Sequence, residues 1–90
     1  MNELQKIIDH YGEEHQIRKL MEECGELIQA VNKWYDERTE DARRNLIEEM
    51  ADVELTVLQV RKMANITMEE VDEVYKAKYY RTFERMEVRK

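Results

Sequence analysis

Residues 22–27 read Glu-Glu-Cys-Gly-Glu-Leu, and residues 48–53 repeat the theme as Glu-Glu-Met-Ala-Asp-Val. Each stretch places carboxylates three residues apart, a spacing that puts them on one face of an α-helix. Twenty-two residues separate Glu26 from Glu49. That length is enough to finish one helix, turn and begin an antiparallel partner. We therefore expect the two stretches to face each other across a helical hairpin.

The composition favours helices and excludes several classes of protein. Of the 90 residues, 40% are charged, two are glycine and none is proline, so the turn-forming residues that sheets need are scarce. The formal net charge of −6 argues against binding to a nucleic-acid polymer, which needs clustered Lys and Arg. We expect one domain over residues 1–90, with a small core that gains further burial by homo-oligomerisation.

The sequence also predicts where the protein works. No apolar run approaches the roughly 18 residues that a membrane span needs, and no signal-peptide pattern is present at residue 1. The single cysteine, Cys24, has no partner for an internal disulfide. We expect a cytoplasmic protein without a membrane partner.

Apolar periodicity and capping residues predict four helices. They cover residues 3–11, 13–35, 41–63 and 68–88. Gly12 separates the first two, and Thr39 is expected to cap the third. Thr67 is expected to cap the last helix, with Glu70 completing a capping box. The fold class is therefore all-α, an antiparallel helical bundle completed by oligomerisation.

The apolar faces of the second and third predicted helices suggest how the two pack. The second helix has a broad apolar face, made of Ile17, Leu20, Met21, Cys24, Leu27, Ile28 and Val31. The third is apolar around much of its circumference, which is typical of a central helix. We expect the two helices to pack on these faces, which would bring together the polar strips that flank them. Those strips hold Gln16, Lys19, Glu23 and Glu26 on one helix and Asn45, Glu49, Asp52, Thr56 and Gln59 on the other.

Four carboxylates on these strips, those of Glu23, Glu26, Glu49 and Asp52, predict a metal site. Carboxylates about 4 Å apart repel by about 4 kcal/mol per pair at an effective dielectric constant of 20. Such a group must bind cations or take up protons. Ligand sets made only of oxygen select hard ions such as Mg²⁺ or Mn²⁺.

Two other interpretations compete with this one. With 21 acidic residues in the chain, such spacings also arise by chance on a solvated helix face. A di-iron bundle would need a Glu-x-x-His motif, but Ile7 precedes His10 by three residues and Gly12 precedes His15 by three. The di-iron interpretation therefore fails, and surface or capping roles are favoured for both histidines.

The acidic motifs and their neighbours resemble those of the MazG-like, all-α nucleoside triphosphate pyrophosphohydrolases. The order Glu22-Glu23-x-x-Glu26 and Glu49-x-x-Asp52 is similar to the family signature EExxE…ExxD. Gln16-x-x-Lys19 before the first motif and Lys78-x-x-Arg81-Thr82-Phe83-Glu84-Arg85 near the end also resemble family segments. The resemblance implies a helical unit that forms a homodimer or homotetramer. It also implies Mg²⁺-dependent cleavage of a (d)NTP to the monophosphate and pyrophosphate, in house-cleaning of the nucleotide pool.

By position, the resemblance implies metal ligands at Glu23, Glu26, Glu49 and Asp52, with Mg²⁺ as cofactor and Mn²⁺ as a possible substitute. Glu22 would be an outer-shell ligand or would position water. A carboxylate of the cluster, Glu23 or Glu49, would accept the proton of the attacking water. These assignments make Glu22, Glu23 and Glu49 the expected catalytic residues.

The triphosphate also requires basic side chains, and the nucleoside requires side chains that contact its base and sugar. The expected substrate-binding residues are Lys78, Arg81, Lys19 and Arg85 for the phosphates, Trp34 for stacking and Gln16 for the base or sugar. Each basic residue has an alternative role as a solvated surface charge. Trp34 has one as a core or interface residue.

Two other functions remain open from the sequence. A non-catalytic regulatory or assembly module would keep the fold and bind nucleotide or a protein partner without hydrolysis. An acidic helical adaptor with no link to nucleotides would oligomerise without any effect of metal or nucleotide.

Overall fold

The computed structural model describes residues 3–88, and these form four α-helices and no strand. The helices are α1 (Glu3–Tyr11), α2 (Glu13–Glu37), α3 (Glu40–Met63) and α4 (Met68–Val88). Their ends agree with the predicted ranges to within two residues. The predicted all-α class is therefore confirmed. Within the described residues, no helix has the length and apolar character needed to cross a membrane.

Local signals fix the helix ends. Gly12, with φ 94°, separates α1 from α2, and its N–H donates to the carbonyl of Ile8 (2.7 Å). The Thr39 hydroxyl accepts the N–H of Ala42 (3.1 Å) and caps α3. Only glycine adopts such a positive φ without strain, and a threonine N-cap satisfies an otherwise unpaired N–H. The predicted roles of both residues in ending and starting helices are confirmed.

The predicted capping box before α4 also forms. The Thr67 N–H donates to Glu70 Oε1 (2.9 Å), and the Glu70 N–H donates to Thr67 Oγ1 (3.1 Å). These bonds lower the pKa of the Glu70 carboxyl, because they favour its charged form. Asn65, with φ 56°, makes the turn that precedes the box.

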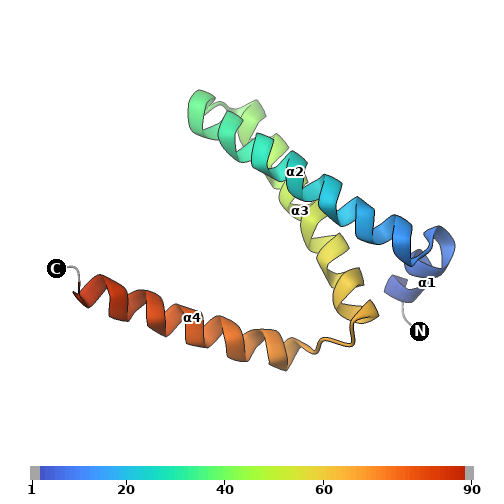
Figure 1. Cartoon of the computed structure of the whole chain (residues 1–90). Coiled ribbons are helices and arrows are strands. Elements are labelled where there is room, and N and C mark those ends of the chain that lie inside the picture. Colours follow the sequence, from blue (N-terminus) through green and yellow to red (C-terminus); the bar gives the residue numbers. More distant parts are fainter. Residues whose placement is uncertain (1–2, 89–90) are drawn as a thin grey trace.

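The four helices make an open arrangement (Figure 1). α2 and α3 lie side by side as an antiparallel hairpin, α1 folds against one end of it, and α4 projects away. α4 contacts none of the other three helices within the described residues. The radius of gyration is 16.6 Å, whereas a compact chain of this length has one of about 12 Å. The chain therefore leaves much of its surface uncovered.

The seam between α2 and α3 is lined by small and polar residues. Each helix buries one row, which consists of Gln16, Glu23 and Ala30 on α2 and of Ala42, Thr56 and Gln59 on α3. The apolar stripe of α2 lies about 100° around the helix from its buried row, so Met21 stays 67% exposed and Ile28 71% exposed. The prediction that α2 and α3 pack on their apolar faces holds only in part, because Leu20 and Leu27 are half-buried but the rest of the α2 stripe is exposed. Cys24, expected in the core, is also exposed.

α3 is not the buried central helix that its composition predicted. Ile47, Met50 and Leu58 on α3 are all 42% exposed or more. At about 100° per residue, the apolar stripe of α2 is centred to one side of the buried row of α2, whereas Ile47 and Leu58 lie nearly opposite the buried row of α3. We call these exposed residues of α2 and α3 the outer apolar face: Ile17, Met21, Ile28, Val31, Ile47, Met50 and Leu58.

Candidate metal centre

Three carboxylates meet at the middle of the α2–α3 seam. Glu23 on α2 and Glu49 and Asp52 on α3 each offer one oxygen, and these oxygens lie within 4.8 Å of one another. Two oxygens on opposite sides of one Mg²⁺ are about 4.2 Å apart. A small adjustment of the side chains would therefore let them share one ion. Glu26 is not one of these three residues, but it lies near enough for its charge to raise the pKa of Glu49.

Two of the oxygens in this cluster have no hydrogen-bond donor. Glu23 Oε2 and Glu49 Oε2 are both buried without a partner in the described part of the chain. Such atoms are rare because a desolvated acceptor without a donor costs free energy. An oxygen-only set with two unpaired buried acceptors fits a hard divalent cation.

The electrostatics of the cluster also fit a bound cation. Burial raises the pKa of the Glu23 carboxyl, and the nearby Glu26 and Asp52 charges raise it further against the opposing bond from Lys19. Burial also raises the pKa of Glu49, followed by the charge and hydrogen bond of Glu26. Both shifts mean that negative charge is disfavoured here. A bound cation would reverse this effect.

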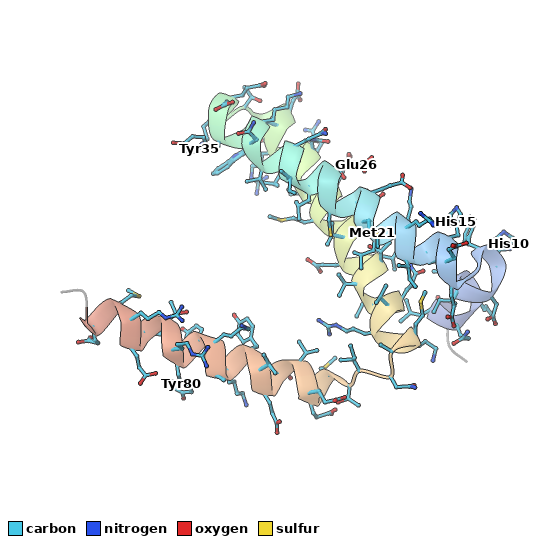
Figure 2. The ribbon with its side chains drawn as sticks, viewed as in Figure 1. His10, His15, Met21, Glu26, Tyr35 and Tyr80 are labelled. Atoms are coloured by element: carbon cyan, nitrogen blue, oxygen red, sulfur yellow. The ribbon has the colours of Figure 1, made fainter. Side chains whose placement is uncertain are left out.

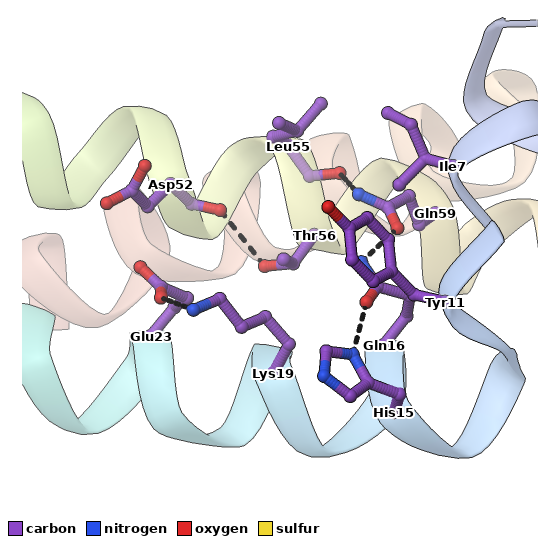
Figure 3. Close-up of a pocket in the computed structure, with 10 residues that line it drawn as sticks. All are labelled: Ile7, Tyr11, His15, Gln16, Lys19, Glu23, Asp52, Leu55, Thr56 and Gln59. Atoms are coloured by element: carbon purple, nitrogen blue, oxygen red, sulfur yellow. Dashed lines mark hydrogen bonds and ion pairs between the residues drawn. The ribbon is translucent and has the colours of Figure 1, made fainter.

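Lys19 provides the nearest positive charge. Its Nζ lies 3.4 Å from Glu23 Oε1, one turn along α2 (Figure 3). The hydrogen bond to Glu23 is the main reason that the pKa of Lys19 is raised. Its side chain is 47% exposed, so it can leave the carboxylate and reach a ligand at the mouth of the seam.

A cavity of about 520 Å³ extends from this cluster toward α1 (Figure 3). Its walls are Ile7, Tyr11, His15, Gln16, Lys19, Glu23, Asp52, Leu55, Thr56 and Gln59. One end is charged and includes Glu23 and Asp52. The other end, against α1, is aromatic and apolar with two amides at its base. Ligand pockets of small molecules have this size and this division of polar and apolar walls.

A chain of hydrogen bonds crosses the bottom of the cavity. Gln59 Nε2 donates to the Leu55 carbonyl (3.3 Å), and Gln16 Nε2 donates to Gln59 Oε1 (2.8 Å). His15 Nδ1 lies 2.7 Å from Gln16 Oε1. The ring of His15 stacks on that of Tyr11, with centroids 5.4 Å apart and planes 18° apart. This network holds the end of the cavity that lies farthest from the carboxylates.

The structure brings some of the expected substrate-binding residues to the cavity and leaves others away from it. Gln16 and Lys19 line it. Trp34 lies eleven residues beyond Glu23, about 16 Å along α2, where the Arg38 guanidinium sits 4.1 Å over its ring. Figure 2 shows the same separation, with His15 near one end of α2 and Tyr35 near the other.

The expected phosphate-binding residues of α4 also lie away from the carboxylates. Lys78, Arg81 and Arg85 are exposed on α4, which contacts neither α2 nor α3 in the described chain. Glu22, the expected outer-shell residue, is exposed beside the cluster, near enough to Lys19 to raise its pKa. One chain thus assembles the acidic cluster without the basic residues of its own last helix.

Sequence reasoning did not assign Tyr11, His15 or Gln59 to a ligand site. Gln59 carried a signal, because it continues the polar strip of Glu49 and Asp52 two turns along a largely apolar helix. Tyr11 and His15 carried none, since their contact depends on the turn at Gly12. Such a contact between two helices is visible only in three dimensions.

Comparisons with known proteins complete the description of this site. Residues 11–84 match the sequence model of the MazG nucleotide pyrophosphohydrolase domain. Neither the curated proteins nor the solved structures provide a match. The matched segment spans both acidic motifs, all the cavity-lining residues except Ile7, and most of α4. The chain belongs to the MazG nucleotide pyrophosphohydrolase family.

Proposed function

We propose that this chain hydrolyses nucleoside triphosphates to the monophosphate and pyrophosphate with Mg²⁺ as cofactor. The observation that carries the proposal is the position of the carboxylate cluster at one end of a cavity large enough for a nucleoside. Membership in the family supports the reaction class. Glu23, Glu26, Glu49 and Asp52 are the proposed metal ligands.

Bound Mg²⁺ would neutralise phosphate charge, polarise the phosphorus and lower the pKa of a water molecule. Side chains of the protein carry out proton transfer, positioning of the water and binding of the phosphates. Glu23 or Glu49 accepts the proton of the attacking water as the new P–O bond forms and pyrophosphate leaves. Glu22, at the exposed edge of the cluster, positions that water. Lys19, which is half exposed beside Glu23, is placed to bind the phosphates.

We further propose that the active form is a homo-oligomer. The chain exposes 7655 Å², about 2,000 Å² more than a compact monomer of its mass. Obligate homodimers bury about 2,000–5,000 Å² in total at an apolar interface. A second copy packed on the outer apolar face would account for this excess area. Its α4, with an apolar stripe that includes Tyr79 and Phe83, would then find the partner surface that its own chain does not offer.

A homo-oligomer would also explain why the basic residues of α4 lie away from the carboxylates of their own chain. α4 of one chain is too far from its own carboxylates to bind phosphates there. We propose that Lys78 and Arg81 reach the site of a second copy, where they neutralise the charge of the triphosphate. Arg85 is a further candidate on the same helix, and Trp34 a candidate for a surface contributed between copies.

The test is pyrophosphate release from a panel of normal and modified (d)NTPs with Mg²⁺ or Mn²⁺. Glu49→Gln and Asp52→Asn are each expected to lower turnover at least about 100-fold, because they remove a ligand charge from the cluster. Glu48→Gln is the matched control, since Glu48 precedes Glu49 on α3 but is exposed and outside the cluster. Circular dichroism would establish that helicity is unchanged in all three.

The alternative outcomes are distinct. No turnover of any nucleotide would overturn the hydrolase proposal. Calorimetric binding of a nonhydrolysable dNTP in that case would favour the non-catalytic module. Full activity of either Glu49→Gln or Asp52→Asn would overturn the proposed metal site while leaving the reaction class open.

A further inference from the structure

The hydrogen-bond chain under the cavity has a fixed direction, which starts at a backbone carbonyl. The Leu55 carbonyl can only accept, so the side-chain atom of Gln59 that faces it at 3.3 Å must be the amide nitrogen. Gln59 Oε1 then faces Gln16, and at 2.8 Å it must receive the Gln16 N–H. The orientations of both buried amides therefore follow from one backbone atom, without any choice of flip.

The same logic fixes the proton on His15. Gln16 Oε1 carries no hydrogen, so the imidazole nitrogen 2.7 Å away, Nδ1, must be the donor. A neutral imidazole has one N–H, and the bond made by one ring nitrogen decides which tautomer is present. With the proton held on Nδ1, His15 Nε2 is a bare hydrogen-bond acceptor.

A second contact fixes the orientation of the His15 ring, in addition to its tautomer. Tyr11 stacks on it nearly parallel, with an interplanar angle of 18° (Figure 3). Tyr11 ends α1 and His15 lies in the first turn of α2, so the positive φ of Gly12 between them makes the stack possible. Gln16 and Gln59 are 5% and 1% exposed, so water does not compete for their mutual bond. His15 itself is exposed and lines the cavity.

We propose that the α1 end of the cavity holds the nucleoside and that His15 Nε2 accepts a hydrogen bond from it. Gln16 and Gln59 act as positioning residues that keep the proton on Nδ1. The donor on the ligand is either the exocyclic amine of a base or a hydroxyl of the sugar. A base with a carbonyl at the same edge would place two acceptors together and bind less well. The inference rests on the proposed function, because that function supplies the nucleotide.

The tautomer is testable without any ligand or turnover. Long-range ¹H–¹⁵N spectra of the full chain, labelled at the imidazole nitrogens, distinguish the Nδ1–H form from the Nε2–H form at a pH where the rings are neutral. We expect His15 to be in the Nδ1–H form. His10 makes no side-chain hydrogen bond in the described structure and serves as the internal reference. An Nε2–H form at His15, or the same mixture in both histidines, would overturn the inference.

Ligand preference is tested by calorimetric binding of three monophosphates with Mg²⁺: dCMP, dUMP and 2′,3′-dideoxycytidine monophosphate. We expect dCMP to bind about threefold to tenfold more tightly than whichever analogue lacks the donor, the range for one hydrogen bond. A weaker dUMP identifies the amine, and a weaker dideoxy compound identifies the hydroxyl. Equal affinities, or no binding by any of them, would overturn the assignment.

Two variants distinguish the proposed roles of His15 and Gln16 from a purely structural role. His15→Phe keeps a ring on Tyr11 but has no acceptor, so the preference should disappear while the variant stays folded, because His15 is exposed. Gln16→Leu releases the proton from Nδ1, so the tautomer should change and the preference should weaken. If Gln16→Leu does not fold, His15→Phe still decides the matter, since an unchanged preference there would overturn the proposal. Loss of hydrolysis with intact preference would instead refute only the proposed reaction.

Discussion

The seam between α2 and α3 and the outer apolar face of the same two helices have opposite characters. The buried seam holds Gln16, Glu23 and Gln59, all 5% exposed or less. The outer face holds Met21 and Ile28, both more than 60% exposed. A chain that folded for itself alone would reverse this arrangement, because burying apolar surface is the main favourable term in folding. The difference supports the two proposals made above, a ligand bound in the seam and a second copy packed on the outer apolar face.

Substitutions on the outer face test this comparison with the largest expected effect. Ile28→Asp should raise the dissociation constant of the oligomer at least about 100-fold, because burying an unpaired carboxylate costs several kcal/mol. Gln29→Asp is the matched control, since it adds the same charge to an exposed neighbour on the polar side of α2. Sedimentation velocity over a range of concentrations measures both.

The contrary result is equally clear. If Ile28→Asp and Gln29→Asp sediment alike, nothing covers the outer apolar face. The open form of α4 would then be the working state of the chain, and Lys78 and Arg81 would have no role at the carboxylates.

The sequence predicts the local structure of this chain well, for physical reasons. Thr39, Thr67 and Glu70 act within one turn of their own helix ends, so their roles do not depend on the rest of the fold. The carboxylate cluster was also within reach of sequence reasoning. Glu23 and Glu26 share one helix face by spacing alone, and two long helices joined by a two-residue link, Arg38 and Thr39, must run antiparallel.

The packing face of each helix was not predictable in the same way. The periodicity of Ile17, Met21 and Ile28 predicts an apolar face, but not whether the same chain covers it. The expectation that α3 covers this stripe assumed that burial happens within one molecule. The contact of Tyr11 with His15 was also out of reach, because it depends on the backbone angle at Gly12.

Substitutions of the two buried amides, Gln16 and Gln59, test the seam. Their expected effect is intermediate in size. Gln59→Leu should lower the free energy of unfolding by about 1–3 kcal/mol, because the Gln16 amide loses its buried partner. The double variant Gln16→Leu with Gln59→Leu should recover most of this loss, since it leaves neither amide unsatisfied. Urea unfolding at one fixed protein concentration measures both, as oligomer stability depends on concentration.

Gln29→Leu is the control for this pair, because Gln29 is exposed on the same helix. It should change the free energy of unfolding by no more than about 0.5 kcal/mol. A double variant that is less stable than Gln59→Leu would contradict the view that these amides serve positioning more than stability.

The pH dependence of the carboxylate cluster gives the smallest effect. The pKa values of Glu23 and Glu49 are raised above 4.5, so between that pH and the raised values the folded metal-free chain holds more protons than the unfolded chain. Its stability should therefore fall as pH rises through this window. The pKa of Lys19 is raised above 10.5, so its contribution is lost only at alkaline pH and does not affect this window.

Magnesium should reverse this trend. Mg²⁺ competes with the protons on Glu23 and Glu49, so its affinity should rise with pH, by up to about tenfold per unit for each proton displaced. The increase in Tm caused by Mg²⁺ should then grow from pH 4.5 upward. Glu23→Gln should flatten this growth because it removes one of the competing protons, whereas Glu48→Gln should leave it unchanged. An increase in Tm that is the same at every pH would show that the ion binds away from the seam.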